Sequence, residues 1–530
     1  MIKGKFAVLA AAVIAAGNVQ AGGFLTNTNQ NISFNRNFAR DGVIAIDGVY
    51  SNPAGVAFLG KGFHLSLNVQ NVYQTRTIVS GMNVPAFKGT PYESVFYQPF
   101  KMNGGNDDGT KKFRGKAAVP VLPSFQAALN YDNWGFQLGF ALNGGGGKAT
   151  FNDGLASFER VVALVPALLA QKGLATDQPS YSLQSYMNGT QLDFGLQFGA
   201  TYKFNDHWAV YGGARFNYIW NKYEGNIMNI SAPIAGEKVK LYDYFNTQAS
   251  TYSDMAFYYK MRASEMAGDP ASQKTFLEQA AKCQAASEQM NQAKEQFADK
   301  YLDCHQYGWG ITPIIGVDYK TGKFNFATRL EFTTHFNIEN HTKRDDTGLF
   351  TDGVNTPNDL PGLWSLGMQY SVRPNLRVMA STHYFFDKNA RMANGRQKHL
   401  SHNTREYLAG VEWDITKDIL VSCGGQITDY GLGDGKALSD MSFVTSSYSL
   451  GFGAKFSVTK RMKVNLAYFF TDYKHFKKNY EQDIQGVRVE CSDDFVRTNK
   501  VLGVGVDIDF YGWLYKLGRA VFCTISSLKT

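Results

Sequence analysis

The segment FNFATRLEFTTHFN, residues 324–337, alternates apolar and polar side chains. Polar or charged residues occupy most odd positions, and the large apolar residues occupy even ones: Phe324, Phe326, Leu330, Phe332 and Phe336. A period of two places these sets on opposite faces of one β-strand. In a soluble sandwich the apolar face points inward, whereas in a membrane barrel it points to lipid and the polar face lines the lumen.

Other segments and the length of the strands favour the membrane barrel. Three segments repeat the alternation with a second face of charged residues or bare glycine: 192–198, 450–456 and 502–510. Trp208 and Trp220 are twelve residues apart on one face of a predicted strand, as are Phe324 and Phe336. Twelve residues make about 40 Å of strand, or roughly 30 Å of height at a tilt of about 40°. That height suits two aromatic girdles around an apolar band, and strands of soluble sandwiches are about half as long.

The pattern predicts an all-β fold, an antiparallel transmembrane β-barrel of about 14 strands. The predicted strands are 62–80, 115–131, 133–143, 190–203, 207–227, 307–320, 322–338, 362–372, 374–387, 404–415, 417–428, 443–458, 460–473 and 497–510. Short polar joints alternate with longer loops, and the short joints are 132–133, 205–206, 321–323, 373–375, 416–418 and 459–461. Short turns on one side and long loops on the other are typical of outer-membrane barrels, and an even strand count puts both ends on the periplasmic side.

The first residues and the composition agree with export to the outer membrane of a Gram-negative bacterium. Lys3 and Lys5 precede an apolar run, and Val19-Gln20-Ala21 supplies small residues at the spacing for cleavage, so we expect a signal peptide over 1–21. Aromatic residues make up 14% of the chain, with 53 glycines and only 14 prolines. The net charge of +8 is spread along the chain, so nucleic-acid binding is not predicted.

The cysteines and the long loops give weaker predictions. The five cysteines have no metal-ligand spacing and an odd count, which leaves a bridge between Cys283 and Cys304 open. Residues 155–175 look helical and apolar, and residues 253–303 have helix-like spacing interrupted at Asp269-Pro270. We expect both to form small helical caps outside the cell, the first being either an inert lid or a landing platform for ligand. The largest loop spans 228–306.

A barrel of about 14 strands lies between small barrels filled by their own side chains and larger ones that leave a water channel. Its lumen therefore needs a stopper. Residues 22–61 precede the first strand, do not alternate and are rich in Gly, Asn and Ala. We predict that they fold into the lumen as an N-terminal plug (hatch), followed by a barrel over 62–510 and a tail of unknown role over 511–530.

The N-terminal sequence GGF…RNFARDGVIAIDGVYSNPAG resembles the start of the long-chain fatty acid outer-membrane transporters, the FadL family, which includes aromatic-hydrocarbon transporters. The matching elements, in order, are Gly23-Phe24, Arg36 to Asp41, Ala45-Ile46-Asp47 and Asn52-Pro53-Ala54. A glycine-rich stretch after the third strand, GGGGKATF at 144–151, also matches. Two features depart from the family: about 20 residues follow Phe510, where the family ends its last strand, and the 228–306 insertion is longer.

The resemblance implies a 14-stranded barrel closed by a hatch and passive transport of hydrophobic small molecules, long-chain fatty acids first among them. Ligand would be caught at extracellular loops and would leave sideways through a gap where the third strand kinks inward. An acyl chain gains about 0.8 kcal/mol per buried CH₂, so an apolar pocket that leads to lipid avoids the cost of an aqueous pore. The implied partners are the ligand and outer-membrane lipid, the implied state is a monomer, and no cofactor or metal is implied.

Candidate ligand-binding residues follow from this reading. A carboxylate ligand needs a cation beside an apolar tunnel, and alternation points Arg215, Arg329 and Lys455 into the lumen, where the alternative is pairing with acids such as Asp193 or Glu331. The resemblance adds Phe24, because the N-terminus of the family reaches into the ligand pocket.

The turn residues Asn52, Pro53 and Ala54 form a candidate hatch motif. Pro53 fixes φ and Asn52 can bond nearby backbone, so we predict that this corner docks the hatch against the barrel wall near the third strand.

Two other classes of function remain open. A structural or adhesin barrel would use the 228–306 loop and would need no hatch. A barrel enzyme such as a lipase or protease would need catalytic residues at the extracellular rim, and the sequence does not supply a convincing set, so we predict that the protein is not an enzyme.

Overall fold

The computed structural model describes residues 26–174, 178–484 and 486–510. The predicted signal peptide, Phe24 and the 511–530 tail lie outside these residues.

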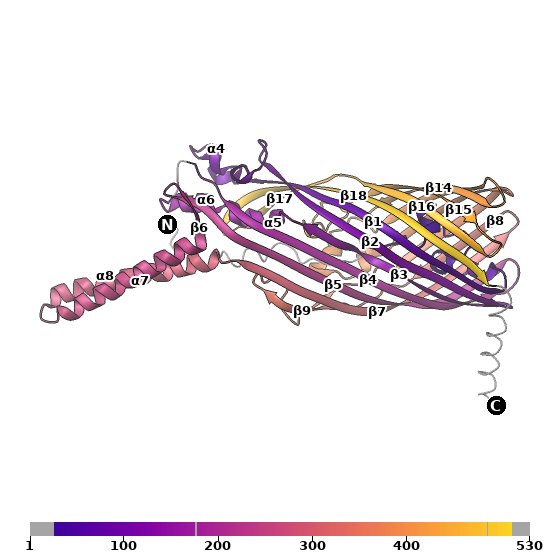
Figure 1. Cartoon of the computed structure of the whole chain (residues 1–530), viewed down its shortest axis with the longest axis horizontal. Helices are drawn as coiled ribbons and strands as arrows, with labels where there is room; N and C mark the ends of the chain where they lie inside the picture. Colours follow the sequence, from indigo (N-terminus) through magenta and orange to yellow (C-terminus); the bar gives the residue numbers. More distant parts are fainter. Residues whose placement is uncertain (1–25, 175–177, 485, 511–530) are drawn as a thin grey trace, which may run out of the picture.

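The chain forms a closed antiparallel barrel of 14 long strands (Figure 1). The barrel closes where β1 pairs with β18, with Phe63 opposite Phe510 and Asn83 opposite Glu490. Closure leaves no free sheet edge, so backbone groups can be satisfied between strands, as lipid demands. The strands are β1 Gly62–Asn83, β2 Thr110–Tyr131, β3 Trp134–Phe151, β4 Ser182–Lys203, β5 Trp208–Ile234, β7 Lys300–Thr321, β8 Phe324–Glu331, β11 Leu363–Arg373, β12 Leu376–Phe385, β13 Arg405–Asp414, β14 Ile419–Asp429, β15 Ser447–Ser457, β16 Met462–Tyr473 and β18 Val487–Phe510.

The predicted barrel of about 14 strands is therefore confirmed, and each predicted strand overlaps an observed one. Four short strands add to the sheet: β6 Glu237–Lys240 pairs with β5, β9 Asn337–Asp345 with β7, β10 Asn355–Pro357 with β9, and β17 Phe476–Ile484 with β18. The six joints predicted to be tight connect strands at one end of the barrel, and the longer loops gather at the other end (Figure 1).

The outward face of the barrel is apolar. On β1, Leu67 and Val69 are exposed while Asn68 and Gln70 are buried, as the alternation predicts. Exposed aromatic residues lie near the short-turn end (Trp134, Trp208, Phe324 and Trp413) and further towards the long loops (Tyr73, Trp309, Tyr407 and Tyr448). This is the surface of a transmembrane barrel. Among the described residues, no helix is both long and apolar enough to cross a membrane.

One predicted strand, 322–338, is interrupted. β8 ends at Glu331 and the sheet resumes only at β9, because Thr334 exchanges backbone hydrogen bonds with Leu360 (3.0 Å each) instead of with β7. Phe336, predicted to lie in a lipid-facing girdle, is instead buried against Ile219 and Leu360. That prediction is wrong, and the alternation of outward and inward side chains in this segment continues only as far as Phe332.

Two elements that neighbour the bend in space explain it. Gly308 and Gly310 of β7 have no side chain, and a Cβ at Gly310 would lie 3.2 Å from the ring of Phe336. Asp359 holds the bend from the other side, since it accepts from the backbone N–H of Phe336 (3.1 Å) and contacts Nδ1 of His335 (2.6 Å).

The long loops carry helices, and the apolar ones pack into the barrel mouth. α5 Ala156–Ala163 and α6 Val165–Gln171 confirm the predicted helical character of 155–175 and are largely buried. The loop after β1 holds η3 Pro85–Phe87, α4 Glu93–Phe96 and η4 Pro99–Asn103, and the loop after β12 holds η5 Asp387–Asn389 and η6 Ala393–His399.

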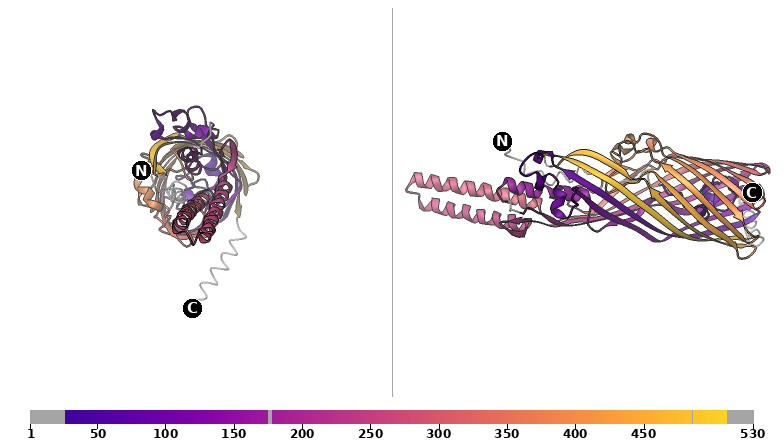
Figure 2. Two further views of the ribbon diagram at one scale, coloured as in Figure 1. Left: turned by 90° about the vertical axis from the view of Figure 1, so that its left-hand side faces the viewer. Right: turned by 90° about the horizontal axis from the view of Figure 1, so that it is seen from above.

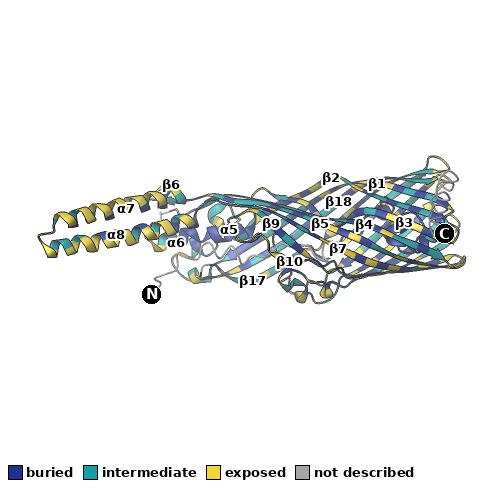
Figure 3. Ribbon diagram, turned by 90° about the horizontal axis from the view of Figure 1, so that it is seen from below, coloured by how far each residue is buried: buried dark blue, intermediate teal, exposed yellow. Residues whose placement is uncertain are grey.

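The 253–303 region is not a small cap. α7 Leu241–Glu265 and α8 Pro270–Gln296 form an antiparallel hairpin that projects from the long-loop end of the barrel (Figures 1 and 2). The predicted interruption at Asp269-Pro270 is confirmed, because Asp269 caps α8 by accepting from the N–H groups of Ala271 and Ser272. Most of the hairpin surface is exposed (Figure 3), so these helices are stabilised chiefly by each other.

The N-terminal segment, residues 26–60, lies inside the barrel. It contains α2 Ile32–Arg36, α3 Gly48–Ser51 and η2 Gly55–Phe58, and residues 30–43 are buried throughout. Asn31 starts α2 by accepting from the N–H of Ser33 (2.7 Å), so the helix begins where the sequence supplies a cap.

Candidate functional site

The hydrogen-bonded ladder between β2 and β3 is interrupted. Ala117 pairs with Ala149 and Phe125 pairs with Phe140, but the residues between them do not pair across. On β2 the interruption contains Pro120 and Pro123, which have no N–H to donate to a neighbouring strand. The two strands are therefore not hydrogen-bonded to each other between 118–124 and 141–148, a stretch that we call the β2–β3 gap.

The other edge of the gap bulges because of glycine. Leu142 pairs with Phe194 and Gly147 pairs with Gln191, so five steps along β3 face three along β4. Gly145 and Gly147 have φ of 93° and 65°, a region that residues with a Cβ rarely adopt. A Cβ at Gly145 would also overlap the carbonyl oxygen of Gln191. The GGGG motif is thus a pair of bulges inside a strand, and β3 runs past the predicted end at 143 to Phe151.

The N-terminal segment is bonded to both edges of the gap. Thr26 bridges to Gly144, and the N–H of Asn27 donates to the carbonyl of Asn143 at 2.6 Å. On the β2 side, the hydroxyl of Ser124 donates to the carbonyl of Gln30 at 2.7 Å. The first described residues therefore bridge the gap from within.

Apolar side chains border the gap on the inside. Val119 and Leu122 of β2 pack against a buried cluster that includes Phe34, Phe38 and Val72. Above it, Ala117 and Ala149 at the end of the gap belong to a larger apolar cluster, which also contains residues of α5 and α6: Ala156, Phe158, Val161, Val162, Ala163, Val165 and Leu169. Buried apolar side chains thus extend from the extracellular loops to the gap.

Two arginines fix the N-terminal segment to the opposite wall. Arg36 and Arg40 each donate from Nη1 to the same oxygen of Glu412 on β13, both at 2.8 Å. Arg40 also makes a two-pronged contact with Asp47 (2.7 and 2.9 Å), and Arg36 donates to the hydroxyl of Ser422 (2.7 Å). All of these groups are buried, so removing one partner leaves an uncompensated charge.

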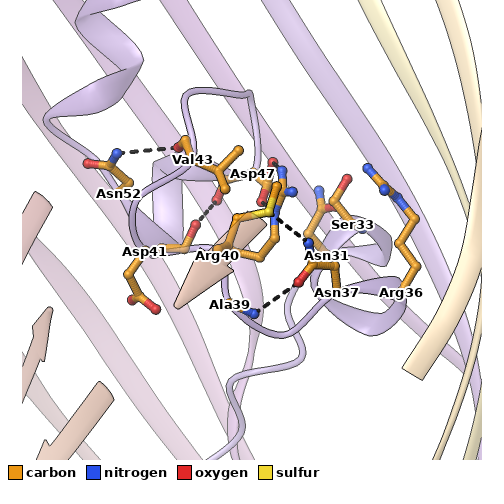
Figure 4. Close-up of polar contacts among 12 residues, drawn as sticks. Asn31, Ser33, Arg36, Asn37, Ala39, Arg40, Asp41, Val43, Asp47 and Asn52 are labelled. Carbon is orange, nitrogen blue, oxygen red and sulfur yellow. Dashed lines mark hydrogen bonds and ion pairs between the residues drawn. The ribbon is translucent and has the colours of Figure 1, made fainter. Parts of the chain in front are cut away.

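Each residue of the Asn52-Pro53-Ala54 turn contacts the wall of the barrel. Asn52 donates to Asp318 of β7 (2.6 Å) and to the carbonyl of Val43 (3.3 Å, dashed in Figure 4). The carbonyl of Pro53 accepts from Gln137 of β3 at 2.6 Å. Ala54 packs against Tyr211 and Ile314. The turn therefore contacts the strand that carries the bulges.

Arg215 and Arg329 lie together and are already paired. Both form ion pairs with Glu331 on β8, as the sequence-based alternative held. Both guanidinium groups also lie over the ring of Tyr50 in α3, at 5.8 and 4.5 Å, and Arg329 donates to the Tyr50 carbonyl. In this arrangement both cations join the wall to the N-terminal segment.

Lys455 lies apart from this group. Its charged neighbours are Arg36, Glu412, Asp507 and Lys463. Within the described part of the chain no hydrogen bond or ion pair is formed by its ammonium group. Of the three candidate cations, Lys455 is thus the one whose charge no described partner occupies, and a ligand-binding role for any of them stays a prediction.

Sequence analysis did not select Asp193 as a functional residue. It is buried, lies opposite Gly144 at the bulge, and neither carboxylate oxygen has a hydrogen-bond partner among the described residues. Alternation predicted that Asp193 faces the lumen, but only the observed bulge places it beside the gap.

No group of side chains within 26–174, 178–484 and 486–510 is arranged to hold a metal ion, and Cys283, Cys304, Cys423 and Cys491 are all free thiols. Cys523 lies outside the described residues. A shallow apolar groove of about 570 Å³ lies on the outward side of β5 to β13, lined by residues such as Trp208, Phe326 and Tyr407, and is separate from the gap.

No family model matches the sequence, and neither does any curated protein. Solved structures do match the fold. A FadL homologue from Pseudomonas aeruginosa aligns over 93% of this chain and 100% of its own, with a TM-score of 0.55 and 12% identity. The P. putida toluene transporter TodX aligns over 88% and 95%, with a TM-score of 0.49 and 12% identity. The fold thus defines the class, a 14-stranded transmembrane β-barrel like that of the FadL homologue.

Proposed function

We propose that this chain is a member of the FadL family and carries hydrophobic small molecules passively across the outer membrane, with long-chain fatty acids as the principal substrates. Residues 26–60 act as a hatch, and ligand leaves sideways through the β2–β3 gap. The observation that carries the proposal is the gap itself, bordered by Val119 and Leu122 and bridged by the N-terminal segment, which bonds to β3 through Thr26 and Asn27 and to β2 through Gln30.

The physical case is that the gap joins two apolar environments. Inside it lies the buried cluster around Phe34 and Phe38, and outside it lies the lipid-facing surface. A ligand on this route exchanges apolar contacts for apolar contacts and never needs to be hydrated, which saves about 0.8 kcal/mol per CH₂ compared with an aqueous pore. The ion pairs of the N-terminal segment support its role as a hatch, because they hold the segment inside the barrel against β13.

Uptake measurements test the proposal. Cells that carry this protein should accumulate labelled oleate faster than cells that lack it, and labelled toluene serves as the hydrocarbon comparison. Faster uptake of toluene alone would support the proposed transport but would make a hydrocarbon, not a fatty acid, the substrate. Equal accumulation of every apolar compound in the two strains would contradict transport.

A second candidate is an adhesin or structural barrel, which the projecting α7–α8 hairpin favours. Such a barrel has no use for a gap bridged by the N-terminal segment. Adhesion that depends on the hairpin, with no effect of the protein on uptake, would favour this candidate.

A further inference from the structure

The outward face of β2 changes character along its length. From Ala118 towards the short-turn end its outward residues are apolar, and Val121 is 63% exposed. In the other direction Lys116, Arg114 and Lys112 are all exposed and alternate with buried Gly115 and Phe113. Three cations therefore point outward in a row, away from the lumen.

Neighbouring strands extend this row into a patch. Lys500 of β18 lies opposite Tyr73 of β1, which lies opposite Ala118 of β2. Lys116 lies opposite Thr150 of β3, two residues from exposed Lys148. With strands about 4.8 Å apart and alternate residues about 6.7 Å apart, the five cations spread over roughly 22 Å, with Lys112 and Lys500 the farthest apart. We call Lys112, Arg114, Lys116, Lys148 and Lys500 the outer cation patch.

The charges of the patch are not matched within the protein. None of the five side chains makes an ion pair or hydrogen bond with another described residue. The acids nearest to the patch in the register of this outer face are Asp472, which is diagonal to Lys500, together with Asp494 and Glu224. Glu224 already contacts Lys222 (2.5 Å), so the five cations outnumber the two remaining acids. The patch therefore carries a net positive charge.

The patch lies at the border of the apolar band. Leu67, Val69 and Tyr73 of β1 are 48, 46 and 42% exposed and mark the lipid-facing surface. Lys500 is level with Tyr73, and Lys116 is one alternation step further towards the long loops. Tyrosines prefer the membrane interface, so the cations lie at the height of lipid head groups in the outer leaflet.

We propose that the outer cation patch binds the phosphorylated head group of a glycolipid in the outer leaflet. Lys and Arg clusters beside a membrane attract anionic head groups, and an Arg guanidinium can contact a phosphate with two N–H groups at once. The site lies on a convex surface, where a free anion would be screened by water and salt. A lipid is already confined to the leaflet, which raises its effective concentration at the patch. The inference rests on the barrel lying in an outer membrane.

The site also lies beside the gap. Lys116 and Lys148 are next to the paired residues Ala117 and Ala149, where the β2–β3 gap begins. A head group held there keeps a lipid in front of the opening. The patch thus selects which lipid borders the gap.

Binding of purified protein in detergent micelles to diphosphorylated lipid A tests the inference, with native mass spectrometry as the readout. Dephosphorylated lipid A with the same acyl chains should bind at least about tenfold more weakly, because only the phosphates meet the cations. Inorganic phosphate in millimolar amounts should neither bind nor displace the lipid. Equal binding of both lipids, or displacement by inorganic phosphate, would overturn the proposal.

Variants localise the effect. The quadruple variant Lys112→Gln, Arg114→Gln, Lys116→Gln, Lys148→Gln should lose the preference for the phosphorylated lipid. The matched control neutralises four exposed cations at the short turns: Lys323→Gln, Lys417→Gln, Lys460→Gln and Arg461→Gln. It should bind like the unaltered protein. Heat-modifiable migration on SDS gels verifies folding, and the milder double variant Lys148→Gln, Lys500→Gln replaces the quadruple one if that fails to fold. Unchanged preference in a folded patch variant would contradict the site.

Discussion

Asn52 donates a hydrogen bond to Asp318 at 2.6 Å and so joins the N-terminal segment, the proposed hatch, to β7. Asn325 donates to the same carboxylate oxygen at 2.8 Å, and Asp318 is fully buried. Asn52→Ala should leave this carboxylate with one donor fewer and weaken the docking of the hatch by about 1–3 kcal/mol. We expect brief openings to small polar solutes, measured as current steps in planar bilayers and as increased sensitivity of cells to small polar antibiotics.

The control for this variant is Asn375→Ala. Asn375 lies in the exposed turn between β11 and β12, and its side chain donates only a long hydrogen bond (3.4 Å) to the carbonyl of Asp414. It should leave the barrel as tight as before. If Asn52→Ala also shows neither current steps nor altered sensitivity, the turn is not part of the closure.

Glu412 is the shared acceptor of Arg36 and Arg40, and its loss should be the more costly change. Glu412→Gln leaves Arg36 buried without an acid, although Arg40 keeps Asp47. We expect a loss of about 3–5 kcal/mol in the free energy of unfolding, measured by urea titration in detergent. Adding Arg36→Gln should recover part of the loss, since the unpaired buried charge is then removed.

The exposed ion pair of Lys61 with Asp132 (2.7 Å) serves as the control, and Lys61→Gln should lower the free energy of unfolding by less than about 1 kcal/mol. Additive losses in the double variant would refute the shared-carboxylate argument.

The sequence predicted the barrel but not the contacts between distant residues. Alternation over segments such as 450–456 depends only on neighbouring residues along a strand, and it was sufficient to predict the barrel and the side chains that face the lumen. Arg36 and Glu412 are separated by 376 positions, and nothing local in either segment specifies that they meet. The bend at Thr334 was not predicted for the same reason. Phe336 keeps the period of two in the sequence, but its burial depends on Gly308 and Gly310 of β7 and on Asp359 in a later loop.

Deleting Gly145 and Gly146 should straighten β3. The deletion removes the two residues by which β3 exceeds β4, so Leu142 to Lys148 can follow a regular ladder and the β2–β3 gap should narrow. We expect the barrel to fold, as judged by heat-modifiable migration, and uptake of oleate to fall at least about tenfold if release is lateral. Substituting Gly322→Asn in an exposed turn, where φ is 54°, is a matched glycine change that should leave uptake unaltered. Full uptake by a folded deletion variant would contradict release of ligand through the β2–β3 gap.

Lys455 is the sharpest test of recognition of a carboxylate head group. Arg215 and Arg329 are bound to Glu331, so their substitution would disturb the hatch together with any ligand site. Lys455→Gln removes a charge that no described partner uses. If it holds the head group, binding of oleate should weaken about tenfold or more while binding of hexadecane stays unchanged, measured by competition with a fluorescent fatty acid. The variant Arg329→Gln should reduce binding of both ligands by loosening the hatch. Equal effects of Lys455→Gln on the two ligands would exclude head-group recognition at this residue.

The projecting hairpin and the buried α5–α6 helices offer competing places for ligand capture. Ser287 donates to the carbonyl of Ala249 at 2.8 Å, so replacing residues 250–286 with a short glycine linker joins helices that already touch. This truncation leaves the apolar cluster around Phe158 and Val162 intact, and we expect oleate uptake within about twofold of the full chain. Val162→Asn places an amide in that cluster and should reduce uptake about tenfold or more, because the cluster then contains an unpaired polar group. Loss of uptake in the truncation, with Val162→Asn unaffected, would assign capture to the hairpin. Loss of adhesion with uptake intact would give the hairpin a separate role and leave the transport route through α5 and the gap unchanged.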